Sequence, residues 1–293
     1  MIGGAQQISE NLRAAVEKAG GKVVFASKVT HIAQSSGPDQ IAGATVTVEG
    51  GKTYRSRVVV SAGCASKFLL KCTFSPPLPR TVQRFADCTL RGAYAKAIVV
   101  YKTAWWRSAG YSGFVTNTKP SVEACAAFGY DYGPEPALVF FIAGDICEKV
   151  CDLPEHGRRE SVLNSVALFF PDAGDVVRSD VVAYHDEFWQ TNEFSGGCPM
   201  TVYPPGFFAE YSARRQLKRP FASSTDPLAT PTLFFAGTDV SNEWVGYMEG
   251  AYIRGKEVAQ QVAKVLKVKA EGGVARAGAT ERKWVPVDGY DSS

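Results

Sequence analysis

A short apolar strand pattern followed by the longest helical pattern of the chain constrains the fold most. The strand pattern covers Thr232–Ala236 and ends in Gly237, Thr238 and Asp239, and the helical pattern covers Gly246–Lys267. A strand that ends in glycine and leads into a helix brings backbone N–H groups and the positive end of the helix dipole to one point, where an anionic ligand is stabilised. The pattern therefore predicts a protein that mixes strands and helices. By itself it does not identify a ligand site, because a buried strand followed by a helix is also common in the cores of such proteins.

The rest of the chain carries further strand and helix patterns, so the expected class is α/β or α+β. The expected strands are two short ones in Lys22–Ala33, a hairpin over Gln40–Ala62 with its turn at Gly50 and Gly51, and single strands at Ala93–Tyr101, Ala137–Ala143 and Asp180–Glu187. The expected helices are Ser9–Lys18, Ser66–Leu70 and Arg158–Phe170, with a loop at Trp105–Arg107 and a loose tail at Val268–Ser293.

Composition and charge exclude several classes of function. The net charge is +3, from 32 basic and 29 acidic side chains, which gives no reason to expect a nucleic-acid partner. No apolar run is long enough to span a bilayer and no secretory leader is apparent, so we expect a soluble intracellular protein without a transmembrane anchor. The sequence leaves cytoplasm and mitochondrion open.

The cysteines indicate reduced thiols rather than a disulfide scaffold or a metal site. There are seven of them, an odd number, in a chain of 293 residues. Cys147 and Cys151 are four residues apart, but a zinc site needs two more ligands and the chain has only three histidines. We therefore expect no metal.

Five segments, in this order along the chain, resemble the flavin monoamine oxidase family. They are Gly3–Glu10, Phe74–Pro79, Gly92–Arg107, Ser195–Gly206 and Phe235–Ala251. The resemblance runs from about residue 3 to residue 267. It implies part of an FAD/NAD(P)-binding-type domain, formed by residues 1–85 and 192–267, and an inserted substrate domain on a mixed β-sheet, formed by residues 86–191, with 268–293 as a flexible tail.

The resemblance assigns most of the matched residues to FAD. Cys198 lies where the family links a cysteine thiol to the 8α-methyl group of the flavin, and the two glycines before it let the backbone approach the ring. The other implied cofactor contacts are Val29 at the adenine, Trp189 beside the flavin, and Gly237, Thr238, Asp239 and Met248 at the turn and the helix start.

Two residues are implied in catalysis. Lys96 matches the lysine that holds a water beside flavin N5; a lysine within an apolar strand needs a partner if it is buried, or it reaches solvent from the strand edge. Tyr247 matches one aromatic wall that orients the amine, whereas the opposite wall position holds Pro199. Phe128 and Phe141 fall near positions that line the substrate cavity, with plain core as the alternative.

The implied activity is FAD-dependent oxidation of a primary or secondary amine to an aldehyde, with oxygen reduced to hydrogen peroxide. A related oxidase of polyamines or amino acids is another reading. The chain lacks the family's Gly-x-Gly-x-x-Gly phosphate motif, because neither Gly3–Gly4 nor Gly20–Gly21 fits it. The alternative is therefore a truncated, non-catalytic member that cannot hold FAD alone. A homodimer stays open.

Overall fold

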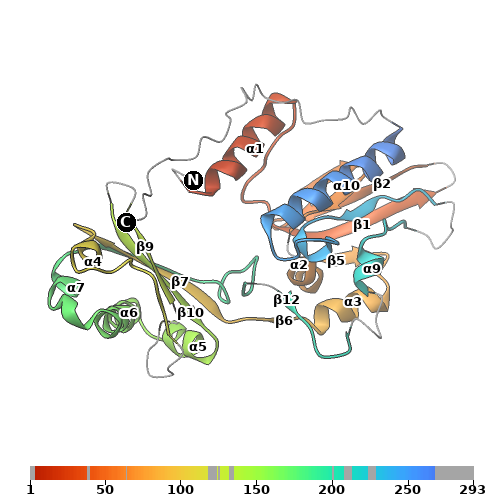
Figure 1. The fold of residues 1–293 in the computed structure, drawn as a ribbon. Coiled ribbons are helices and arrows are strands. Elements are labelled where there is room, and N and C mark those ends of the chain that lie inside the picture. Colours follow the sequence, from red (N-terminus) through yellow and green to blue (C-terminus); the bar gives the residue numbers. More distant parts are fainter. Residues whose placement is uncertain are drawn as a thin grey trace.

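Helices and strands are mixed along the whole described chain, which confirms the expected class. The computed structural model describes residues 4–37, 40–63, 65–117, 124, 126–131, 135–199, 201–207, 213–223 and 229–267. The expected loose tail, Val268–Ser293, lies outside these residues. Figure 1 shows two lobes, one formed by the two ends of the described chain and one by its middle.

The first sheet belongs to the lobe formed by the two chain ends and has the strand order β3-β2-β1-β5. Its strands are β1 (Val29–Gly37), β2 (Gln40–Val48), β3 (Thr53–Ser56) and β5 (Thr73–Ser75). The first three are antiparallel neighbours, and β5 runs parallel to β1. Gly50 and Gly51 both have positive φ angles and form the β2–β3 turn, as predicted.

Two strand predictions in this region are wrong in part. The expected second hairpin arm, Arg57–Ser61, leaves the hairpin after β3, and its residues Val59–Ser61 (β4) pair in parallel with Leu233–Phe235 (β13). Within Lys22–Ala33 only β1 forms, because residues 21–28 join no sheet. β-branched residues favour extended backbone, but they do not specify the partner strand.

Strand β13 of the parallel pair β4–β13 is covered on both faces. Every side chain of β13 is buried: Leu233 and Phe235 face the core with α2 (Ala65–Lys71), α3 (Arg80–Asp87) and α9 (Ala213–Leu217), and Phe234 faces α10 (Met248–Leu266). Strands buried on both faces are continuously apolar, which explains the run that the sequence shows.

A buried arginine fastens α10 to this pair. Arg254 is 2% exposed and donates hydrogen bonds to the carbonyl oxygens of Phe235 (3.2 and 3.1 Å) and Lys218 (2.9 Å). It also pairs with Glu257 at 2.9 Å. The buried guanidinium is thus satisfied by carbonyls and one carboxylate, as a buried charge requires.

The middle lobe is built on a second sheet with the order β11-β7-β10-β9-β8. Its strands, all antiparallel to their neighbours, are β7 (Tyr94–Tyr101), β8 (Val115–Thr116), β9 (Ala126–Tyr130), β10 (Ala137–Ala143) and β11 (Val181–Phe188). The helices of this lobe are α4 (Trp105–Ser108), α5 (Asp145–Cys151), α6 (Glu155–Phe169), η1 (Pro171–Ala173) and α7 (Val176–Ser179). They pack on one face of the sheet, where side chains such as Ala97, Val99 and Phe140 are fully buried.

The predicted loop at Trp105–Arg107 is instead the helical turn α4. Trp106 is fully buried, Trp105 is 6% exposed, and both rings pack edge-on against Tyr101. Burial of two indole rings draws this segment into the core, where a helical turn satisfies part of its backbone.

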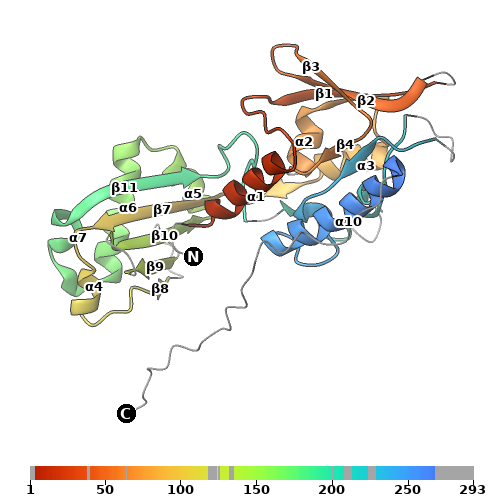
Figure 2. The same ribbon diagram turned by 90° about the horizontal axis from the view of Figure 1, so that it is seen from above.

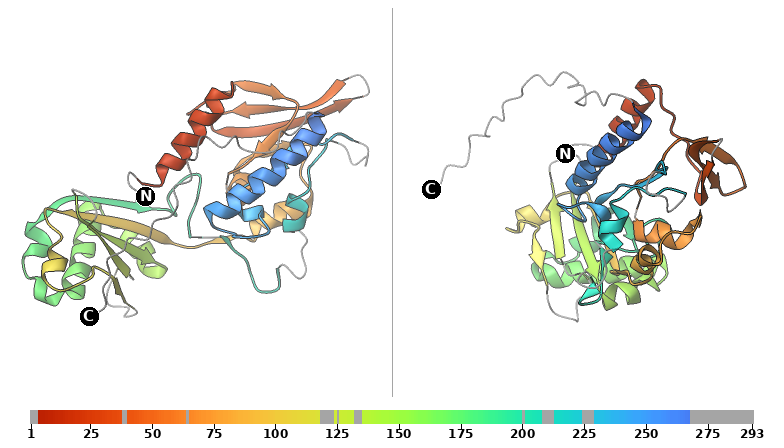
Figure 3. Two further views of the ribbon diagram at one scale, coloured as in Figure 1. Left: turned by 45° about the horizontal axis from the view of Figure 1, so that its top comes forward. Right: turned by 90° about the vertical axis from the view of Figure 1, so that its right-hand side faces the viewer.

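The chain crosses between the lobes twice. The outward crossing follows β6 (Leu90–Arg91), and the return crossing leads to β12 (Thr201–Val202), which pairs with β6. Figures 2 and 3 show α1 (Gln6–Lys18) between the lobes, and none of its residues is buried. No helix of the described residues is both long and apolar enough to cross a membrane.

We predict that Arg254→Met lowers the free energy of unfolding by about 2–3 kcal/mol, because buried carbonyls then lack donors. Urea unfolding followed by circular dichroism measures this. Lys256→Met, at an exposed lysine of the same helix, is the matched control and should change stability by less than about 0.5 kcal/mol. Equal unfolding midpoints for the two variants would show that Arg254 is not an anchor.

Candidate functional site

The two chain crossings touch through their backbones. The N–H of Cys198 donates to the carbonyl of Gly92 at 3.1 Å. A Cβ atom on Gly92 would lie 2.6 Å from the Cys198 oxygen, and one on Gly197 (φ 130°) would lie 2.7 Å from the Gly92 oxygen. Both positions therefore require glycine. These glycines let the two crossings approach each other, in addition to any approach to a ligand.

The loop before Cys198 is organised by one asparagine. The side-chain oxygen of Asn192 accepts from the N–H groups of Phe194 and Ser195, each at 3.1 Å, and its carbonyl accepts from Gly196 at 2.8 Å. The Ser195 hydroxyl donates to the carbonyl of Trp189 at 3.2 Å. Such an Asx turn fixes the chain locally, so the position of Cys198 follows from residues that lie in the same loop.

Lys96 points away from the helices of the middle lobe. Its neighbours Ala95 and Ala97 are fully buried, whereas Lys96 is exposed, because side chains alternate along β7. Its Nζ lies 5.4 Å from the centre of the Phe141 ring, a cation–π contact. Of the two alternatives for this lysine, burial with a partner or exposure to solvent, the structure shows exposure, and the Phe141 ring is a described contact.

Lys96 also acts on the candidate tether. Burial raises the pKa of the Cys198 thiol, and the positive charge of Lys96 lowers it by a smaller amount. This electrostatic effect falls off with distance, so Lys96 is one of the charges close enough to act on the thiol.

Phe128 and Phe141 lie on the same open face of the sheet. Their ring centres are 5.4 Å apart, and the row continues from Phe128 to Phe114 at 5.1 Å and from Phe141 to Tyr94 at 5.6 Å. Phe114 and Phe128 are 56% and 42% exposed, so they are not plain core. We call these four rings the aromatic row. Tyr94 and Phe114 were not predicted, although the alternation of β7 places Tyr94 beside Lys96. The N–H of Trp189 bonds the carbonyl of Tyr94 at 3.1 Å.

The glycine turn after β13 also requires its glycine. Gly237 has φ 95°, and a Cβ there would lie 3.1 Å from the Ala62 oxygen and 3.2 Å from the Gly63 oxygen. The turn η2 (Thr238–Val240) follows, and the loop from it to α10 is closed by the Thr238 hydroxyl, which accepts from the N–H of Gly246 at 2.7 Å. The carboxyl ends of β4 and β13 therefore meet here, where ligands of parallel sheets usually bind.

Arg91 connects this turn with the chain crossings. It lies 4.0 Å from the Asp239 carboxylate, and it donates to the Ser66 hydroxyl. A Cβ on Gly197 would lie 2.8 Å from the Cβ of Arg91. Arg91 was not among the predicted site residues, and its only signal in the sequence is a basic residue directly before Gly92.

The start of α10 is open. Tyr247 and Met248 are 64% and 59% exposed, and no side chain caps the helix, so backbone N–H groups of its first turn keep their hydrogen-bonding capacity. Trp244 packs edge-on against Tyr247 at 6.0 Å, and both border a hollow of about 580 Å³ with Met248 and Glu249. Pro199 is exposed and supplies no second aromatic wall.

Val29 lies in a different pocket, of about 250 Å³. This pocket is lined by Ser27, Lys28, Val29, Gly63, Lys67, Phe68, Lys71, Glu193 and Phe194. The loop from Glu193 to Cys198 connects it with the crossings.

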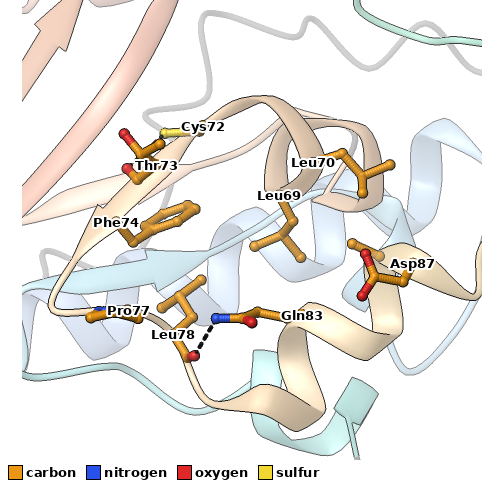
Figure 4. A pocket seen from close by; sticks show the side chains of 10 residues that line it. Leu69, Leu70, Cys72, Thr73, Phe74, Pro77, Leu78, Gln83 and Asp87 are labelled. Carbon is orange, nitrogen blue, oxygen red and sulfur yellow. Dashed lines mark hydrogen bonds between the residues drawn. The ribbon is translucent and has the colours of Figure 1, made fainter.

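A third pocket, of about 360 Å³, lies between α2, β5 and α3 and contains none of the expected site residues (Figure 4). Leu69, Phe74 and Leu78 line it, and Gln83 bonds the carbonyl of Leu78 at 2.9 Å. Burial raises the pKa of the Cys72 thiol in its wall to about 12, so this thiol is protonated and unreactive near neutral pH.

The described residues fit an extended anionic cofactor. An uncapped helix of 19 residues supplies N–H donors at α10, and Cys198 supplies a partly buried thiol near a cation. In the described part of the chain, no group of three or more His, Cys, Asp or Glu side chains could hold a metal ion.

The comparisons with known proteins agree with this fit. Residues 1–263 match the family of flavin-containing amine oxidoreductases. Two similar proteins are a flavin-containing amine oxidase of Oncorhynchus mykiss (30% identity, covering 89% of this chain and 46% of that protein) and a putative flavin-containing monoamine oxidase of Mycobacterium tuberculosis (31%, 90% and 52%). The chain spans about half the length of these relatives.

Solved structures show the same fold. A putrescine oxidase double mutant matches with a TM-score of 0.73 and 22% identity, and cyclohexylamine oxidase from Brevibacterium oxydans matches with 0.72 and 25%. Each match covers 90% of this chain and 53% of the other.

We predict that Lys96→Met raises the pKa of the Cys198 thiol further, because it removes the charge that lowers this pKa. The pH dependence of iodoacetamide alkylation at Cys198, followed by peptide mass spectrometry, should move to higher pH. Lys102→Met, at an exposed lysine just beyond the end of β7, should leave the profile unchanged. If both variants gave the wild-type profile, Lys96 and Cys198 would not share a site.

Proposed function

Because the chain belongs to the family of flavin-containing amine oxidoreductases, we propose that it binds FAD and takes part in oxidising a primary or secondary amine to an aldehyde, with release of hydrogen peroxide. The observation that supports the proposal is that the charge of Lys96 acts on the Cys198 thiol while its ammonium lies over Phe141, one ring of the aromatic row. When bound, FAD supplies the two-electron acceptor for the substrate's α C–H bond.

On the cofactor side, Cys198 is the proposed covalent tether. Trp189 supports its loop, and Gly237, Thr238, Asp239 and Met248 hold the flavin ring at the turn and at the open start of α10. Val29 meets the adenine. The uncapped N–H groups of α10 stabilise negative charge on the ring, since they carry the positive end of the helix dipole.

On the substrate side, Lys96 holds a water molecule through its N–H donors. Its charge also disfavours a second ammonium close by, and so favours the neutral amine with a free lone pair. Phe128 and Phe141 exclude water from the apolar part of the amine, and Tyr247 orients the nitrogen.

We propose that the chain likewise divides into a cofactor-binding part and a substrate-binding part. Residues 1–85 and 192–267 form the cofactor part, and residues 86–191 form the substrate part, which has a hydrophobic core of its own. Amine and oxygen are the proposed reactants. Homodimerisation stays a prediction.

Acid precipitation of the purified 293-residue chain tests the cofactor proposal. We expect flavin absorbance in the pellet, and its loss from the pellet for Cys198→Ser, because only a covalent link survives denaturation. Flavin in the supernatant alone would refute the tether and retain binding. Colourless fractions would refute the proposal for this chain and favour the alternative, a non-catalytic family member that cannot hold FAD alone.

Pro199→Tyr tests the missing aromatic wall. We expect kcat/KM for benzylamine to rise by up to about tenfold, because an aromatic pair contributes roughly 0.5–1.5 kcal/mol. Steady-state oxygen uptake measures this, with Pro204→Tyr, at another exposed proline, as the control. No gain over that control would mean that the amine is oriented elsewhere.

A further inference from the structure

The pocket between α2, β5 and α3 is separate from the proposed flavin and substrate contacts (Figure 4). None of its lining residues is among the residues proposed to touch FAD or the substrate. Its volume of about 360 Å³ lies within the usual range of about 300–1,000 Å³ for sites that bind small molecules. The pocket can therefore hold a second ligand, and its lining indicates the chemistry of that ligand.

One part of the lining is apolar and is held in place by the core behind it. Leu69 from α2, Phe74 from β5 and Leu78 before α3 line the pocket. The Phe74 ring packs edge-on against Phe68, with ring centres 6.0 Å apart, and lies 6.5 Å from the ring of Phe235. These contacts fix the wall before a ligand binds, so binding costs little further ordering of side chains. The wall accommodates an aromatic or aliphatic group.

A carboxylate also lines the pocket. Asp87 is the last residue of α3, and among the residues that the structure describes it forms no ion pair or hydrogen bond. The C-terminal end of a helix carries partial negative charge, which favours a cation there. Two basic residues close by in the chain, Arg84 and Lys71, are not part of the lining, and Lys71 lies 3.8 Å from Glu193 instead. The negative charge is therefore available to a ligand.

The other polar groups of the lining offer acceptors to a ligand. The side-chain nitrogen of Gln83 donates to the carbonyl of Leu78 at 2.9 Å, which leaves Oε1 of Gln83 as an acceptor. The Thr73 hydroxyl and the Cys72 thiol donate to backbone carbonyls at 3.2 and 3.4 Å. Gln83 and Asp87 are four residues apart, so they lie on the same face of α3. The pocket thus favours a ligand that donates hydrogen bonds and carries positive charge.

We propose that this pocket binds an organic ammonium ion with an apolar body, independently of FAD. The apolar body lies against Leu69, Phe74 and Leu78, and the ammonium group donates to Asp87 and Gln83. Such an ion belongs to the same chemical class as the proposed substrate. The chain then holds an amine at a second, non-catalytic site, which goes beyond the proposed function.

Isothermal titration of the 293-residue chain with 4-phenylbutylamine and with 4-phenylbutan-1-ol tests this proposal. The two probes share their apolar body, and only the amine is charged at neutral pH. We expect the amine to bind about two- to fivefold more tightly than the alcohol, which is the size of effect that an exposed ion pair gives. High salt should reduce this difference, because exposed charges are screened.

Two variants, each with a matched control, locate the site. Asp87→Asn should remove the difference between the probes, whereas Asp145→Asn, at an exposed carboxylate at the start of α5, should retain it. Leu70→Ala should weaken both probes equally, because this side chain extends the apolar lining and is 56% exposed. Leu168→Ala, at a leucine of α6 that is 60% exposed, should weaken neither. Far-UV circular dichroism checks that the variants fold.

Three results would overturn the proposal: equal affinities for the two probes in the unaltered chain, an unchanged difference in Asp87→Asn, or unchanged affinities in Leu70→Ala. Amine bound at the proposed catalytic site does not affect this comparison, because none of the substitutions changes a residue proposed to act there. Asp87→Asn should leave the flavin content of the acid-precipitated pellet unchanged. Amine binding that depends on Asp87 in a chain without flavin would refute the proposed function alone, and flavin without such binding would refute this site alone.

Discussion

The position of the candidate site depends on the backbone contact between Gly92 and the Gly197–Cys198 segment. Two chain segments can lie this close only where neither carries a side chain in the contact, and both Gly92 and Gly197 lack one. The hydrogen bond from the Cys198 N–H to the Gly92 carbonyl then fixes the backbone of Cys198 beside Gly92. Gly92 lies four residues before Lys96 in the chain. Gly92 and Gly197 thus let the two crossings pack directly against each other.

Charge is distributed unevenly around this contact. Arg91 is held by Asp239 and Ser66, and Lys96 lies over an aromatic ring in the open. One cation is therefore committed to the structure, whereas the other keeps N–H donors for water or ligand. Fixed charges with satisfied partners provide a preorganised electrostatic environment at such a site.

The periodicity of apolar residues predicted the helices and strands well. It predicted poorly which strands pair with each other and what surrounds each side chain. The apolar run Ala137–Ala143 is β10 to the residue, and the long C-terminal helix begins two residues after its predicted start. The fate of Val59–Ser61 could not be read locally, because its partner Leu233–Phe235 lies far along the chain. The alternation of β7 was visible, but only the sheet shows that helices cover one face and leave Lys96 on the other. Arg91 belongs to no motif, and only its neighbours from distant segments, Asp239 and Ser66, mark it as part of the site.

The pairing of β6 with β12 has a consequence for how the molecule can change. The middle lobe leaves and re-enters the rest of the chain at neighbouring points, as an inserted domain does, so its two ends are already joined in space. A lobe attached in this way can be lengthened, shortened or exchanged for another without a change in the chain path of the other lobe. Recombination at residues 91 and 199 would therefore replace the entire aromatic row together with Lys96 and Cys198, while it leaves the β4–β13 pair and α10 unchanged.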